Sequence, residues 1–340
     1  YGSGWNPDAG APGSGYYTCE DFGEILRYAA RHHIRVIPEI DIPGHSRAAI
    51  KAMDARYARY ISTDPDRARE YLLTDSCDTS VYRSAQEYTD NVMNIAMPSA
   101  YRFVRKVLGE LRRMYEKAGV ELSVVHIGGD EVPRGAWSGS PICREFMDRN
   151  GLADTHALKD HFVRWLYGEL DAKGIRLAGW QEIVMLPDGR HVNRELPGRR
   201  ILSYGWNTQP GEGFDEVPYA LANAGYPVVL CNVTNLYLDL AYNKHHMEPG
   251  HRWGGYVDAR STFDMLPYDI YKSVRMYPDG APVDLISVSS GKESLSPDAR
   301  RNIVGIQGQL WAETIRNFSM AEYLLFPKMY GLAERAWNAS

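Results

Sequence analysis

Two neighbouring carboxylates, Asp130 and Glu131, are the residues of this sequence whose types and spacing best suit catalysis. They end the segment His126-Ile127-Gly128-Gly129-Asp130-Glu131, in which the two glycines let backbone and ligand approach closely. Like charges in one site raise the pKa of one carboxyl, which leaves a protonated acid beside an ionised partner. General acid catalysis near neutral pH requires that pair of states. A bare Asp-Glu dipeptide is usually an exposed turn, but the His-x-Gly-Gly frame at the end of an apolar run favours the catalytic interpretation.

A second polar segment, Pro38 to His45, also stands where an apolar run becomes a loop. It contains two acids, Glu39 and Asp41, as well as the histidine. By itself it indicates less, because Pro-Gly is an ordinary turn and acids can cap a helix. We expect the histidines of the two segments, His45 and His126, to orient nearby acids rather than to catalyse directly.

Six short apolar runs that end in polar or acidic residues alternate with longer amphipathic stretches. Such runs are typical of strands buried on both faces of a parallel sheet. They are residues 34–41, 122–131, 176–182, 200–206, 227–239 and 302–313. Alternating strands and helices predict an α/β fold, and polar residues at the carboxyl ends of the strands favour a (β/α)8 barrel of the TIM type. An open doubly wound sheet fits less well, since no Gly-rich phosphate loop is present. About six of the eight β/α units are visible.

Local signals predict the ends of four helices. Thr18–Asp21 has the form of a capping box, and Ser319–Glu322 has the form of the cap of the last helix. Gly119 and Gly174 should each end a longer amphipathic helix, because glycine readily adopts the left-handed conformation of a helix C-terminus.

The composition is that of a globular protein: 44% of the 340 residues are hydrophobic and 24% are charged. A net charge of -5 argues against a nucleic-acid partner, and no apolar run is long enough for a membrane span. The 23 Tyr and 8 Trp suit carbohydrate binding, since aromatic faces stack on sugar rings. The four cysteines lack CxxC spacing, which argues against zinc and leaves disulfides and free thiols as alternatives.

The polar motifs resemble, in sequence order, those of the family 20 glycoside hydrolases, the β-N-acetylhexosaminidases. The segment Gly179-Trp180-Gln181-Glu182 is similar to the family's Gly-Trp-Asp-Glu, with Gln in place of Asp. The resemblance covers nearly the whole chain. The matching segments are residues 17–21, 38–45, 126–131, 179–182, 203–206, 237–239, 310–313, 326–327 and 333–337.

The resemblance implies substrate-assisted, retaining catalysis, in which the substrate's own 2-acetamido oxygen is the nucleophile. By motif position, Glu131 would protonate the leaving oxygen and later activate water. Asp130 would orient the acetamido N–H and stabilise its developing charge, and Tyr237 would donate to the acetamido oxygen. Neighbouring residues on one strand cannot easily straddle a sugar, which agrees with this mechanism.

The same resemblance implies a pocket closed around one sugar. Three tryptophans would line it, and Asp239 and Glu313 would accept hydrogen bonds from sugar hydroxyls. Such acceptors enforce exo action, because a substituted hydroxyl would leave them unpaired. Trp253, in the loop after Asp239, is a candidate for a mobile wall. The expected substrate-binding residues are His45, Trp180, Trp206, Asp239, Trp253, Trp311 and Glu313, with Asp41 and His126 in support.

A metal site is the alternative use of the segment His245-His246-Met247-Glu248 with His251. The spacing is not His-Glu-x-x-His, and the intervening Pro249-Gly250 favours a loop. The resembled family needs no cofactor, so we expect neither a metal nor a cofactor.

Three functions remain open. The first is an exo-enzyme that removes terminal β-GlcNAc or β-GalNAc from glycans, and the second is a lacto-N-biosidase that releases a disaccharide. The third is a sugar-binding barrel without catalysis. The absence of a match to the family's sugar-gripping arginine favours the non-catalytic barrel. The presence of Asp130, Glu131 and Tyr237 argues against it. A glycan-degrading enzyme of this class is expected to be exported to the periplasm or beyond.

We expect residues 1–340 to be a single catalytic barrel domain that is incomplete at its N-terminal side. The first matched segment, 17–21, belongs to a helix that follows the family's second strand. An upstream part would then supply two strands and the arginine. The opening Tyr1-Gly2-Ser3-Gly4-Trp5 is not a signal peptide, and the sequence leaves the oligomeric state open.

Overall fold

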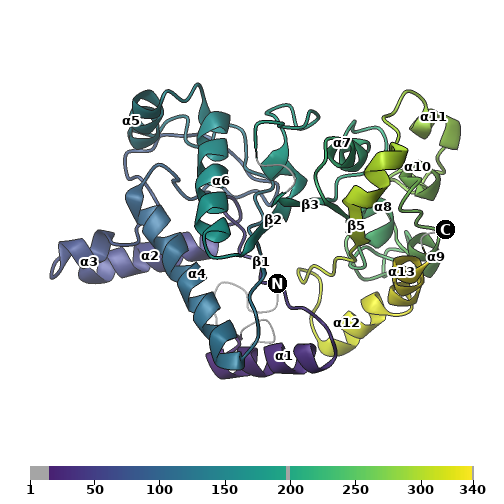
Figure 1. Ribbon diagram of the computed structural model, residues 1–340, viewed down its shortest axis with the longest axis horizontal. Coiled ribbons are helices and arrows are strands. Elements are labelled where there is room, and N and C mark those ends of the chain that lie inside the picture. The colour runs from purple at the N-terminus through teal and green to yellow at the C-terminus, as the bar shows by residue number, and fades with distance from the viewer. Residues whose placement is uncertain (1–14, 197–199, 339–340) are drawn as a thin grey trace. The chain divides into compact units, whose positions relative to one another are not determined.

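The computed structural model describes residues 15–196 and 200–338, and the opening segment Tyr1–Trp5 lies outside them (Figure 1). The chain divides into two compact units. The N-terminal unit is Tyr17–Ile183, and the described part of the C-terminal unit is residues 15–16, 184–196 and 200–338. Each unit holds parallel strands with helices between them.

The N-terminal unit carries most of the long helices. α4 lies against α6 (Figure 1), where the ring of Tyr101 contacts those of Phe162 and Trp165, and α6 also packs along β2. The elements are α1 (Cys19–Arg31), α2 (Arg47–Tyr60), α3 (Pro65–Arg69), α4 (Pro98–Ala118), β1 (Val124–His126), α5 (Pro141–Asn150), α6 (Thr155–Asp171), β2 (Arg176–Trp180) and the 3-10 helix η1 (Gln181–Val184).

β1 and β2 pair in parallel, with Val125 opposite Leu177. The run 34–41, which the sequence predicts to be a strand, forms only a single parallel bridge, between Glu39 and His126. The strand prediction is therefore wrong in extent. The physical reason is the proline at position 38, which has no N–H to extend the ladder. The segment still runs along β1, because His126 N donates to Pro38 O at 3.0 Å and Ile40 N donates to His126 O at 2.9 Å.

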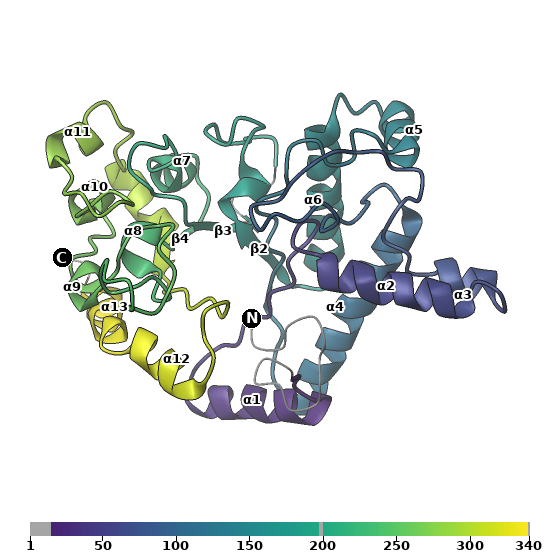
Figure 2. The same cartoon turned by 180° about the vertical axis from the view of Figure 1, so that it is seen from behind.

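The C-terminal unit has three parallel strands in sequence order, β3-β4-β5, joined by helical crossovers. Its helix α13 packs against α9, as the view from behind also shows (Figure 2). The elements are β3 (Leu202–Gly205), α7 (Val217–Asn223), β4 (Val228–Leu230), α8 (Val233–Leu236), α9 (Ala259–Phe263), α10 (Ile270–Ser273), α11 (Leu285–Ser289), the 3-10 helix η3 (Pro297–Asn302), β5 (Ile303–Ile306), α12 (Phe318–Leu325) and α13 (Lys328–Trp337).

Two predicted strands of the C-terminal unit are longer than the observed ones. The run 227–239 divides into β4 and the short helix α8, and the run 302–313 contains the four-residue β5. Buried loops that follow a strand are as apolar as the strand itself, so hydrophobicity alone does not mark the boundary. The expected substrate-binding residues of these runs, Asp239 and Glu313, lie on those loops.

The predicted helix boundaries are partly confirmed. Thr18 and Asp21 form the expected capping box at the start of α1, and Gly119 ends α4 in the left-handed region with φ 69°. α6 ends earlier than predicted, at Asp171, and Gly174 (φ 70°) turns the chain after it.

The cap predicted at Ser319 is wrong. Asn317 caps α12 by accepting from Met320 N, and the last helix is α13, which begins at Lys328. Asn is as good an N-cap as Ser, so the sequence did not discriminate between the two.

All four cysteines are free thiols, which decides between the two alternatives that the sequence left. Cys19 and Cys77 are exposed, whereas Cys143 and Cys231 are buried. None of the helices in the described ranges combines the length and the apolar character needed to cross a membrane.

Candidate active site

The turn after β1 is built around its two glycines. Gly128 and Gly129 both have positive φ, 64° and 87°. A Cβ at Gly128 would overlap the side chain of Asp41, and a Cβ at Gly129 would overlap that of Ile183. The protein itself therefore requires both glycines, because Gly128 leaves room for Asp41 and Gly129 leaves room for Ile183 against the backbone that carries the Asp-Glu pair.

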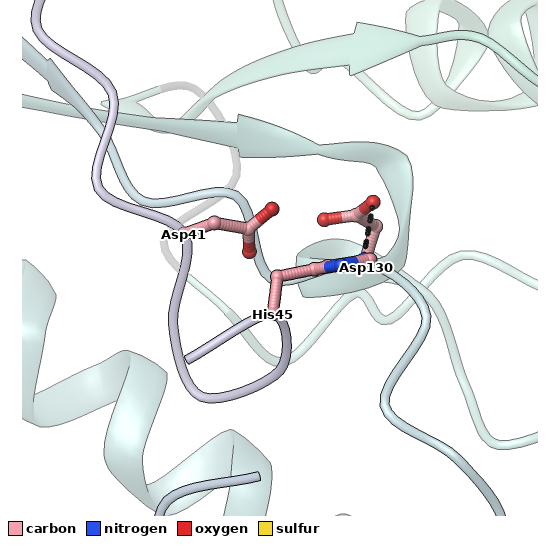
Figure 3. Close-up of side chains that lie close together, drawn as sticks. All are labelled: Asp41, His45 and Asp130. Carbon is pink, nitrogen blue, oxygen red and sulfur yellow. Dashed lines mark ion pairs between the residues drawn. The ribbon is translucent and has the colours of Figure 1, made fainter. Parts of the chain in front are cut away.

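His45 approaches both carboxylates of that pair. Its Nε2 is 3.4 Å from Asp130 Oδ2, an ion pair that is drawn in Figure 3. The same nitrogen is 3.4 Å from Glu131 Oε2. His45 and Glu131 both occupy the left-handed backbone region, with φ 48° and 46°. Residues other than glycine are rarely held there, and such strain concentrates at functional sites.

The pKa values of the cluster are strongly perturbed. Hydrogen bonds to Asp130 and Glu131 raise the pKa of His45 well above its ordinary value, so the imidazole is protonated. Burial, followed by the charge of Asp130, raises the pKa of Asp41 far above that of a free carboxyl. A protonated Asp41 beside a positively charged His45 leaves the negative charge on the Asp-Glu pair.

Glu131 departs from the expectation that one carboxyl of the Asp-Glu pair would be held protonated by its neighbour. Burial acts to raise the pKa of Glu131, but hydrogen bonds from His45 and Gln86 outweigh it, so the pKa is lowered. The amide nitrogen of Gln86 donates to Glu131 Oε2 at 2.9 Å. The carboxyl whose pKa is raised is Asp41 instead, because its burial and the charge of Asp130 both disfavour its ionised form.

A second layer of contacts supports the cluster from β2. Trp180 is buried, and its indole Nε1 donates to Glu39 Oε1 at 3.0 Å. His126 Nδ1 lies 3.2 Å from the same oxygen, and its ring meets that of Trp180 edge to face at 4.9 Å. Glu39 thus fixes the orientation of both rings.

The side chains of Asp41, His45 and Asp130 offer metal-ligand atoms that all lie within 4.8 Å of one another. A protonated imidazole has no lone pair for a metal, so we interpret this group as an ion-paired network. The histidine-rich segment 243–251 gathers no three ligands within the described ranges 15–196 and 200–338. Its His251 instead pairs with Glu313, with Nε2 and Oε2 3.5 Å apart.

In the C-terminal unit, three aromatic rings stand together. Trp253 contacts Tyr237 and Trp206 edge to face, with ring centroids 5.6 and 6.1 Å apart. Tyr237 is buried, and Trp206 packs on the same apolar cluster, whereas Trp253 is 46% exposed. Tyr237 thus forms the buried inner part of this aromatic group, and Trp253 forms its exposed outer part.

Asp239 follows this aromatic group and is completely buried. Burial raises its pKa to about 6, with His251 acting to lower it and Glu313 to raise it. Among the residues that the structure describes, no hydrogen-bond partner meets either oxygen of its carboxylate, although backbone N–H groups of Asp239 and Trp311 lie near enough to lower the pKa. A buried acceptor in this condition is suited to a ligand hydroxyl.

The structure therefore gathers the expected site residues in two local groups. The group of the N-terminal unit is Asp41, His45, His126, Asp130, Glu131 and Trp180. The group of the C-terminal unit is Trp206, Tyr237, Asp239, Trp253, Trp311 and Glu313.

Three contact residues were missed from the sequence. Glu39 carried a signal, since it alternates with Asp41 along one extended segment. His251 stood out only as part of the metal alternative, and its contact with Glu313 was not expected. Gln86 carried no signal, because it comes from a long loop and reaches Glu131 only through the fold.

Residues 2–340 match the catalytic domain of glycosyl hydrolase family 20. The chain belongs to this family. Within family 20, a β-hexosaminidase of Vibrio vulnificus is 36% identical over 96% of the chain, which covers 38% of that protein. β-Hexosaminidase B of Pseudoalteromonas piscicida is 35% identical over 97% of the chain, covering 42% of that protein. The chain thus spans about two fifths of the length of these relatives.

Solved family 20 structures have the same fold. The exo β-N-acetylglucosaminidase of Vibrio harveyi, in complex with N-acetylglucosamine, superposes with a TM-score of 0.71 at 31% identity, covering 95% of this chain and 42% of that one. The β-N-acetylhexosaminidase of Streptomyces coelicolor gives 0.61 at 25% identity, covering 96% and 51%. The expected (β/α)8 barrel class is confirmed for this family 20 domain.

Proposed function

We propose that this domain is the catalytic part of an exo-acting enzyme that hydrolyses terminal, non-reducing β-linked N-acetylhexosamines by substrate-assisted retaining catalysis. The observation that carries the proposal is the adjacent pair Asp130 and Glu131, to which His45 contributes a shared positive charge. Two carboxyls on one turn cannot flank a glycosidic bond, so the nucleophile must come from elsewhere. An acetamido group on the substrate supplies it.

The catalytic roles follow from the chemistry of each group. Glu131 protonates the leaving oxygen and afterwards activates water, while Asp130 accepts from the acetamido N–H and stabilises the positive charge of the oxazolinium intermediate. Tyr237 donates to the acetamido oxygen, which directs that oxygen towards the anomeric carbon. Asp130 and Tyr237 make interactions that strengthen as charge develops on the acetamido group in the transition state.

The other site residues bind the sugar. Two acids accept from hydroxyl groups: Asp239, which is buried, and Glu313, which is exposed and pairs with His251. The tryptophans pack on the acetamido methyl and on the ring face. Trp180 is fixed by its hydrogen bond to Glu39, and Trp206 by the apolar cluster around Tyr237. The names of the relatives support this substrate class. Because an enzyme of this class acts on glycans, we expect it to be exported from the cytoplasm.

A panel of p-nitrophenyl glycosides tests the proposal on the full-length protein. We expect hydrolysis of the β-GlcNAc and β-GalNAc substrates and none of the β-glucoside, because only the first two carry the internal nucleophile. Turnover of the glucoside would contradict the mechanism. Release of a disaccharide but no monosaccharide from an oligosaccharide would favour the lacto-N-biosidase alternative.

Gln86 gives a second prediction, on pH dependence. Its amide stabilises the ionised form of Glu131, so Gln86→Leu should raise the pKa of Glu131. The acid must be protonated before reaction, and the rate falls as pH rises through its pKa. The alkaline limb of kcat/KM should therefore move to higher pH.

Glu87→Gln is the matched control for this change. Glu87 adjoins Gln86, but its carboxylate pairs with Arg83 on the surface, so its loss should leave the alkaline limb in place. An unmoved limb in Gln86→Leu, or an equal shift in the control, would show that Gln86 does not act on Glu131.

A further inference from the structure

A fully buried lysine lies behind the sugar-binding acid of the C-terminal unit. Lys328 is the first residue of α13 and has no exposed surface. Its ammonium donates to the backbone carbonyls of Leu238 at 2.8 Å and Leu240 at 2.6 Å. Those two carbonyls lie on either side of Asp239 in the chain, so one side chain holds the backbone from which the acid projects.

The lysine is itself held in place. Its Nζ lies 4.0 Å from the centre of the Tyr242 ring, and the hydroxyl of that tyrosine donates to the carbonyls of Tyr323 and Phe326 at 2.9 Å each. Thr262 Oγ1 donates to Lys328 O at 2.7 Å. The ring of Tyr242 contacts the ammonium itself, whereas the bond from Thr262 reaches only the backbone of the helix start.

Burial of a cation is costly unless carbonyls and anions compensate for the lost water. Burial lowers the pKa of Lys328 to about 8, while the charges of Asp239, Glu248 and Asp258 act to raise it. The effect is mutual, because a positive charge that is stabilised by Asp239 stabilises the ionised form of Asp239 in return. The remaining charged neighbours of Asp239 are His251, which lowers the pKa of Asp239, and Glu313, which raises it.

We propose that Lys328 is a positioning residue for sugar recognition, which keeps Asp239 ionised and fixes its backbone so that the carboxylate meets the sugar hydroxyls. The inference rests on the proposed function, since it concerns the affinity of the site for an N-acetylhexosamine. Lys328 does not touch the sugar. It acts through the carbonyls of Leu238 and Leu240 and through its charge.

The test measures inhibition by N-acetylglucosamine as a function of pH, on the full-length protein. This inhibitor reports sugar binding without proton transfer by Glu131. In the wild type, binding should weaken below pH 6, as Asp239 becomes protonated, and above pH 8, as Lys328 loses its charge.

Lys328→Met removes the charge and the two hydrogen bonds. The acidic limb of binding should move up by about one pH unit, which lowers the ionised fraction of Asp239 at pH 6 roughly fivefold. KM should rise more than kcat falls. Lys328→Arg keeps a positive charge that does not titrate, so the loss of N-acetylglucosamine binding above pH 8 should disappear. If Lys328→Met fails to fold, Lys328→Arg still tests the role of the charge.

Thr262→Val is the matched control, because it removes a buried hydrogen bond at the same helix start without changing charge. It should lower stability and leave both limbs where they are. In an Asp239→Asn background, Lys328→Met should no longer shift the acidic limb.

The outcomes separate the two proposals. A wild type that neither hydrolyses aryl N-acetylhexosaminides nor binds N-acetylglucosamine overturns the proposed function. A wild type that does both, with pH limbs unmoved by Lys328→Met or with loss above pH 8 retained in Lys328→Arg, overturns the role of Lys328 alone.

Discussion

Replacing Glu131 by Gln should lower kcat/KM for natural oligosaccharides by about 10²–10⁴-fold, the range that general acid catalysis contributes. Gln keeps the shape of the side chain but cannot transfer a proton. Both His45 and Gln86 approach the same oxygen, Oε2, so we expect Oε1 to carry the proton to the leaving group. Sugar binding should be nearly unchanged, because the acceptors of the sugar hydroxyls lie elsewhere.

The dependence on the leaving group distinguishes acid catalysis from a general loss of structure. An activated aryl glycoside needs little protonation, so its bond cleavage should be affected far less than that of an alkyl glycoside or a disaccharide. Steady-state kinetics on both kinds of substrate, with N-acetylglucosamine inhibition as the measure of binding, make the comparison. Equal losses on both kinds would remove Glu131 from the role of proton donor.

Replacing Asp130 by Asn should lower kcat by about 10²–10³-fold, comparable with the loss of one preorganised transition-state contact. The carboxylate stabilises positive charge on the acetamido nitrogen, and that charge is present only during reaction. A cyclic thiazoline that mimics the intermediate should therefore bind the wild type tightly and the variant weakly, while a simple sugar loses much less affinity.

Tyr237→Phe is a parallel test, directed at the acetamido oxygen. Tyr237 is buried with its ring against Trp253, and Phe preserves that packing, so the change isolates the hydroxyl. We expect a fall in kcat with little change in unfolding temperature. Unchanged kcat and thiazoline affinity in Asp130→Asn would require the substrate-assisted mechanism to be abandoned.

The electrostatics of the acid cluster show where inference from sequence was incomplete. Adjacent carboxylates led to the expectation that one of the two would be protonated. The structure adds His45 and Gln86, which stabilise the ionised form of Glu131, and it moves the raised pKa to Asp41. Before substrate binds, Glu131 is thus in the state that activates water. The lowered pKa predicts that the wild type is most active on the acidic side of neutrality.

The sequence by itself determined the order of strands and helices, the motifs at the strand ends and the chemistry that those motifs allow. These features are local: apolar runs, capping boxes and Gly-Gly turns depend on residues a few positions apart. The run 34–41 forms a single bridge rather than a strand, but it still lies along β1 and brings Asp41 and His45 to the Asp-Glu pair.

Only the tertiary structure decided which groups tune the reactive residues. Gln86 reaches Glu131 across 45 positions, and Lys328 reaches the carbonyls on either side of Asp239 across about 90. Neither contact has a periodic or local signature, since a loop glutamine and a helix-start lysine look like solvated residues in any sequence. The protonation of a buried carboxyl depends on the charges and donors that the fold packs around it, and those distances exist only after the chain has folded.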